Sequence, residues 1–135
     1  MPPSIVKHLD VGAGFDKGRL YRIVPEGFRR PRPPALGRAP TGELVALLEH
    51  PNGWHRDTAS RLLYQRQDRS AVAPLRKLAD EARSPLGRMH ALYALDGLKA
   101  LDAAAVLRGL RDPDSRVREH ALRLAERFES TPEMV

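Results

Sequence analysis

From residue 41 onward, apolar residues recur at helical spacing, in segments that short polar or proline-containing breaks separate. The last segment has the clearest pattern, with apolar side chains at Val117, Ala121, Leu124, Ala125 and Phe128. Steps of three and four residues place these side chains on one face of a helix. The chain has six such segments, and we predict a helix in each of 41–49, 54–67, 72–82, 84–97, 103–110 and 112–128.

The first 40 residues lack this periodicity and hold seven of the 12 prolines. Residues 18–24 are rich in β-forming side chains between Gly18 and Pro25, which predicts one strand. A lone strand has unpaired edges and no stability of its own, so it belongs to a sheet elsewhere or packs on this chain. We assign the chain to a remnant of a preceding β-domain (1–24), a Pro/Arg-rich linker (25–40), a helical domain (41–129) and a tail (130–135).

An internal repeat links alternate helices. The motif Arg-x-x-Ala occurs at 56–59, 88–91 and 118–121, so its alanines are 32 and then 30 residues apart. A period near 30 residues with two helices per period indicates an α-solenoid, in which stacked helix pairs bury a shared core. We predict an all-α fold of about three helix pairs, preceded by the Pro-rich arm, with the three alanines as packing residues.

The arginines of this motif are candidate functional residues. Arg56, Arg88 and Arg118 each stand near a predicted helix start, where a guanidinium can reach the preceding loop or an acid of the neighbouring repeat. Asp112 and Arg118 fit such a pair. We therefore favour a structural role for the arginines over ligand binding.

Trp54 begins the second predicted helix, beside His55 and Arg56. One interpretation is that Trp54 covers the open end of the solenoid or docks the Pro-rich arm. The other is a contact with a partner, because Trp and Arg are enriched among the residues that anchor protein interfaces. We take Trp54, His55, Arg56, Arg88 and Arg118 as the possible interaction residues.

The charge distribution bears on the class of partner. The net charge is +6, yet residues 1–40 hold 8 Lys/Arg against 3 Asp/Glu and residues 41–135 hold 15 against 14. The helical part is thus nearly neutral, whereas helical-repeat proteins that bind nucleic acid need a basic face on the helical body. We expect no nucleic-acid binding. Without an apolar run of about 20 residues we also expect no membrane insertion.

The sequence offers little for catalysis or cofactor binding. The chain has no cysteine, which excludes disulfides, thiolate metal sites and a C-x-x-C-H haem attachment. His50 and His55 are five residues apart, a spacing that does not place two metal ligands on one helix face. No Gly-rich phosphate loop or G-x-S-x-G turn occurs. We predict no catalytic residue, no cofactor and no metal, and therefore not an enzyme.

Residues 112–125, with Asp-Pro followed by Val-Arg and then Ala-Leu, resemble the core of a HEAT repeat of the phycobilisome-lyase type. The two earlier copies resemble it more loosely, because His55 and Gly87 stand where Val117 precedes the arginine. This resemblance implies HEAT-type helix pairs. It also raises the alternative of a lyase-like protein that handles a chromophore or another small ligand.

Residues 16–25 resemble the closing propeller strand of large bacterial proteins described as putative membrane-bound dehydrogenases, related to sorbosone dehydrogenase, and residues 44–59 resemble the start of their helical section. In that family a β-propeller precedes a Pro-rich linker, HEAT repeats and a c-type cytochrome. The resemblance implies a non-catalytic spacer or interaction module, with the propeller, the cytochrome or another polypeptide as partner, in the periplasm or cell envelope.

Overall fold

The computed structural model describes residues 23–29 and 34–128. The chain divides into two compact units, residues 1–33 and 34–135. In the first unit, a turn is closed by the Phe28 N–H, which donates to the Pro25 carbonyl at 3.2 Å. Of the predicted strand, residues 18–22 lie outside the described residues, and Ile23 and Val24 are exposed and not in a strand.

The second unit is helical, as predicted. Its described part contains six α-helices: α2 (Thr41–Ala46), α3 (Gly53–Arg66), α4 (Val72–Glu81), α5 (Pro85–Gly97), α6 (Ala103–Leu110) and α7 (Ser115–Ala125). A 3-10 turn, Leu47–Glu49, extends α2, and another, Glu126–Phe128, extends α7. The six predicted helices are therefore confirmed.

Side chains at the N-caps fix where four of these helices begin. Asn52, Ser84, Asp102 and Asp114 each accept a hydrogen bond from a backbone N–H in the first turn that follows. Such caps satisfy amide groups that have no partner within the helix, and losing one typically costs about 1 kcal/mol. Short polar loops therefore suffice to end one helix and begin the next.

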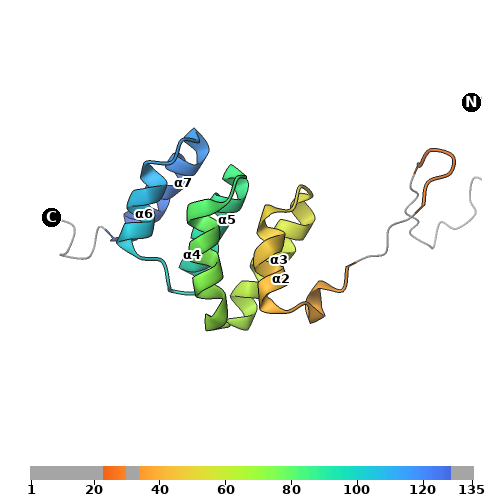
Figure 1. Ribbon diagram of the computed structural model, residues 1–135, viewed down its shortest axis with the longest axis horizontal. Coiled ribbons are helices and arrows are strands. Elements are labelled where there is room, and N and C mark those ends of the chain that lie inside the picture. Colours follow the sequence, from red (N-terminus) through yellow and green to blue (C-terminus); the bar gives the residue numbers. More distant parts are fainter. Residues whose placement is uncertain (1–22, 30–33, 129–135) are drawn as a thin grey trace, which may run out of the picture. The chain divides into compact units, whose positions relative to one another are not determined.

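The helices pack as pairs that stack side by side (Figure 1). Within each pair, α2 contacts α3, α4 contacts α5 and α6 contacts α7. Between pairs, α5 contacts both α3 and α7, while α4 contacts both α2 and α6. The result is a two-layered solenoid, with α3, α5 and α7 in one layer and α2, α4 and α6 in the other.

Two aliphatic clusters form the core. The first joins the first two helix pairs through Leu48, Leu63, Leu75 and Leu95, and the second joins α5 to α6 and α7. The three motif alanines, Ala59, Ala91 and Ala121, are all fully buried. Their predicted packing role is confirmed, because a small residue at this position lets neighbouring helices approach closely.

Residues 34–40 cover the α3 end of the solenoid. Leu36 and Ala39 are buried, and Arg66 of α3 donates to the carbonyls of Ala39 at 2.6 Å and Gly37 at 3.0 Å. This segment lies within the predicted linker, but it belongs to the helical unit. Its many prolines leave no periodic pattern from which the burial of Leu36 and Ala39 could be predicted.

Two glycines give a matched test of the packing. At Gly109 an added Cβ would lie 2.9 Å from the Ala121 Cβ and 3.1 Å from Leu92 Cδ1, whereas at Gly87 it would meet the flexible Glu49 side chain. Because Ala121 and Leu92 are both buried, we expect Gly109→Ala to lower the free energy of unfolding by about 1–3 kcal/mol. Gly87→Ala should lower it by less than about 1 kcal/mol, because the exposed Glu49 side chain can move aside. Urea denaturation measures both, and equal effects would contradict the packing described.

Candidate functional site

The three motif arginines make the same local contact. In each, Nη1 donates hydrogen bonds to the backbone carbonyls of the residues six and five positions earlier, in the loop before its helix. The distances are 2.6–3.3 Å, and the acceptors are His50 and Pro51, Ala82 and Arg83, and Asp112 and Pro113. The predicted contact between arginine and preceding loop is confirmed, and it holds each loop against its own helix.

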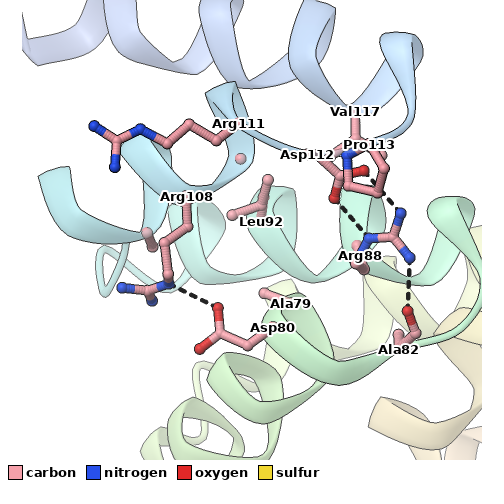
Figure 2. A pocket seen from close by; sticks show the side chains of 12 residues that line it. Ala79, Asp80, Ala82, Arg88, Leu92, Arg108, Arg111, Asp112, Pro113 and Val117 are labelled. Carbon is pink, nitrogen blue, oxygen red and sulfur yellow. Dashed lines mark hydrogen bonds and ion pairs between the residues drawn. The ribbon is translucent and has the colours of Figure 1, made fainter.

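Arg88 also joins two repeats (Figure 2). Its Nε and Nη2 donate to the two carboxylate oxygens of Asp112 at 2.6 and 2.8 Å, and the two side chains are only 12% and 8% exposed. The carboxylate therefore pairs with the arginine of the preceding repeat. The predicted pairing of Asp112 with Arg118 is wrong, because Arg118 bonds to the Asp112 carbonyl instead.

The pair has an electrostatic consequence. Hydrogen bonds from Arg88 hold the pKa of Asp112 below its usual range, and the carboxylate in turn raises the pKa of Arg88. A carboxyl group whose pKa is lowered by folding contributes stability above its unfolded pKa of about 3.9, and it loses this stability as the pH falls through the folded pKa.

We therefore predict that wild-type protein loses more stability below about pH 4 than an Asp112→Asn variant, whose amide cannot titrate. Urea denaturation from pH 7 down to pH 3 should show the stability difference between the two proteins shrinking. A constant difference over this range would contradict the role of the ionised carboxylate. The Thr41 hydroxyl also lowers the pKa of Asp68, but Asp68 is present in both proteins, so its contribution to the pH dependence cancels in the comparison.

Arg56 lacks the acid that Arg88 has. Six residues before Arg88 stands Ala82, at the position that Asp112 occupies before Arg118. Within the described residues, the buried Arg56 Nε and the buried His55 Nδ1 have no hydrogen-bond partner. The inter-repeat pairing is therefore present between the second and third repeats and missing between the first and second.

Trp54 lies at the start of α3 with its side chain 57% exposed. Together with Arg61 and Leu62 it lines a hollow whose other wall is formed by residues 34–38. Its ring packs edge-on against the His55 ring, at 5.2 Å between centroids. Trp54 thus lies beside residues 34–38, whereas Arg88 lies in the contact between the second and third repeats, so the candidate residues do not form one site.

A hollow between α3 and α5 brings together side chains that the sequence analysis did not select. Tyr64 of α3 faces His90 and Tyr93 of α5 across a volume of about 360 Å³, with Asp57 and Arg61 among its lining residues. Tyr64 is 63% exposed and its ring lies against Gly97. Burial, reinforced by the Arg56 charge, lowers the pKa of His90, which favours its neutral form.

The same layer continues to α7. The Tyr93 hydroxyl and His120 Nδ1 form a hydrogen bond of 2.9 Å, with the two rings edge to face. Beyond His120 a second groove runs between α5 and α7, where Leu86 and Met89 supply apolar surface. The layer of α3, α5 and α7 therefore presents two adjacent hollows of mixed aromatic, apolar and charged character.

Within residues 23–29 and 34–128, no three His, Asp or Glu side chains are grouped so that they could hold a metal ion. None of the helices in this part of the chain combines the length and hydropathy needed to cross a bilayer.

Comparison with known proteins bears on the repeat. Residues 41–126 match the model of a family described as HEAT repeats, whereas no curated protein and no solved structure matches the chain. The match begins at the first residue of α2 and reaches the turn after α7, so it covers the stacked pairs and the arginine motifs together. With more than half of its length in this match, the chain belongs to the HEAT-repeat family.

Proposed function

We propose that the chain is a non-catalytic scaffold that binds a protein through the layer of α3, α5 and α7. The observation that carries the proposal is the hollow between α3 and α5, where Tyr64 and Tyr93 stand on neighbouring helices. Tyrosine is enriched among the residues that dominate binding energy at protein interfaces. The nearby Asp57 and Arg61 offer both signs of charge for orienting a partner.

The proposal is tested by a photo-crosslinking residue placed at position 64 or, as a control in the other layer, at the exposed Ala104. We expect a defined protein to crosslink at 64 and not at 104 in cells that make the chain. With that protein purified, Tyr64→Ala should weaken binding at least about tenfold and Gln65→Ala should not. Equal crosslinking at both positions, or an unchanged Kd for Tyr64→Ala, would refute this binding surface.

A finer hypothesis makes the chain part of a modular bacterial oxidoreductase, with a propeller dehydrogenase and a cytochrome c as neighbours. Its support is the resemblance of residues 16–25 and 44–59 to that family. Sequencing the intact gene decides it: an upstream propeller and a downstream C-x-x-C-H motif are expected, and the absence of both would dispose of it. The alternative of a lyase-like protein that handles a chromophore stays a prediction, for which binding of an added bilin is the test.

The chain is not expected to bind nucleic acid, because its helical part is nearly neutral. Fluorescence anisotropy with labelled DNA and RNA checks this expectation. Tight binding that weakens steeply with salt would overturn it, since release of counterions from phosphates produces that dependence.

A further inference from the structure

The last helix pair exposes residues whose counterparts in the preceding pair are covered. Leu92 and Leu122 each stand four residues after a motif arginine, on α5 and α7. Leu92 is 3% exposed, and its Cδ1 packs where Gly109 of α6 leaves room. Leu122 is 61% exposed. The leucine at this position packs against the next repeat on α5, whereas on α7 it is exposed at the α6–α7 end.

The arginines show the same contrast. Arg88 is largely buried in its ion pair with Asp112, whereas Arg118 is exposed and, within the described residues, forms no ion pair. Arg118 and Leu122 are four residues apart, so both project from one side of α7. Together, Arg118 and Leu122 form what we call the terminal face.

The opposite end of the solenoid differs. Residues 34–40 cover α3 there, with Leu36 only 4% exposed and Arg66 holding the Gly37 and Ala39 carbonyls. One end is therefore covered by a segment of the chain itself, and the other presents the exposed Leu122 beside Arg118, which has no carboxylate partner among the described residues.

We propose that the terminal face binds a further helix pair of the same type as α6–α7, carried by the partner. The contact between α5 and the α6–α7 pair indicates which residues the partner's helix pair must carry. It needs a carboxylate in the loop between its helices, to pair with Arg118 as Asp112 pairs with Arg88, and a glycine three residues earlier, to admit Leu122 as Gly109 admits Leu92. This inference goes beyond the proposed function and does not rest on the α3–α5 hollow.

A second copy of the chain does not meet these requirements. Its first loop offers His50 at the position of Asp112, so Arg118 would meet an imidazole instead of a carboxylate. Its α3 end is also occupied by residues 34–40. We therefore expect the terminal face not to bring two copies together.

The chain has no cysteine, so a single Leu122→Cys thiol reports on the terminal face directly. The test compares its labelling by a maleimide in the full chain and in a version with a second copy of residues 99–128 inserted after residue 128. The inserted length equals the 30-residue step from Arg88 to Arg118, so the copied aspartate falls opposite Arg118. Ala46→Cys, exposed on α2, is the control thiol.

We expect the insertion to slow labelling at position 122 by a factor of roughly ten or more, because docking buries the thiol, while labelling at position 46 stays unchanged. An Asp→Asn change at the copied aspartate should restore much of the labelling rate at position 122. Circular dichroism must show that the added helices form.

Three results would overturn the proposal. The first is an unchanged rate at position 122 although the added helices are formed. The second is slow labelling in the full chain at every concentration, which would mean that residues of the chain itself cover the face. The third is labelling that slows as the protein concentration rises, together with a dimer by light scattering, which would mean that a second copy covers it.

Discussion

Replacing Asp112 by alanine should lower the free energy of unfolding by about 3 kcal/mol. The reason is what the substitution leaves behind. Arg88 is 12% exposed and its Nε and Nη2 both donate to this carboxylate, so the variant buries a guanidinium without a counter-ion. Removing one partner of a buried pair costs far more than the pair contributes when both are present.

Asp80→Ala is the matched control. Arg108 and Asp80 also join α6 to α4, at 2.8 Å, but their side chains are 51% and 42% exposed. Water can solvate the arginine left alone, so the control should lose less than about 1 kcal/mol. Urea denaturation at pH 7 measures both variants. A loss for Asp112→Ala as small as that for Asp80→Ala would mean that Arg88 finds other partners.

Replacing Leu95 by alanine should lower the free energy of unfolding by about 3 kcal/mol, which is the second large effect. Leu95 is fully buried in the cluster that joins α5 to the first helix pair, where its removal leaves a cavity that stacked helices cannot close. Because each pair contacts only its neighbours, this loss should weaken the junction between the first and second repeats in particular.

Leu122→Ala supplies the comparison, since the same substitution removes a side chain that is 61% exposed. It should change the free energy of unfolding by less than about 0.5 kcal/mol. Thermal denaturation followed by circular dichroism distinguishes the two variants. If Leu122→Ala proved as damaging as Leu95→Ala, the terminal face would already be covered in the chain itself.

The helices could be predicted from the sequence because their signals are local. Leucine and alanine at steps of three and four mark each buried face, and Ser84 or Asp114 before a helix marks its start. The packing of residues 34–40 on α3 could not be predicted, because no local pattern marks it. Leu36 stands alone among prolines, and only its contact with the helical unit shows that it is buried.

The contacts between repeats could not be predicted in the same way. Asp112 is six residues from Arg118 and 24 from Arg88, so nearness in sequence favoured the wrong arginine. Likewise, Tyr64 and Tyr93 are 29 residues apart and meet at one hollow because α3 stacks on α5. Pairings of this kind follow from the stacking register, which the motif at 56–59, 88–91 and 118–121 gives only approximately.

In this solenoid an acid six residues before a motif arginine ties its repeat to the arginine of the preceding one, as Asp112 does with Arg88. The free energy of unfolding of an Ala82→Asp variant tests this claim most directly, because Ala82 occupies that position in the second repeat and the buried Arg56 Nε has no partner among the described residues. We predict a gain of about 1 kcal/mol, or about 5 °C in Tm, that disappears when Arg56 is replaced by glutamine. A destabilised Ala82→Asp protein, or a gain that persists without Arg56, would contradict the account.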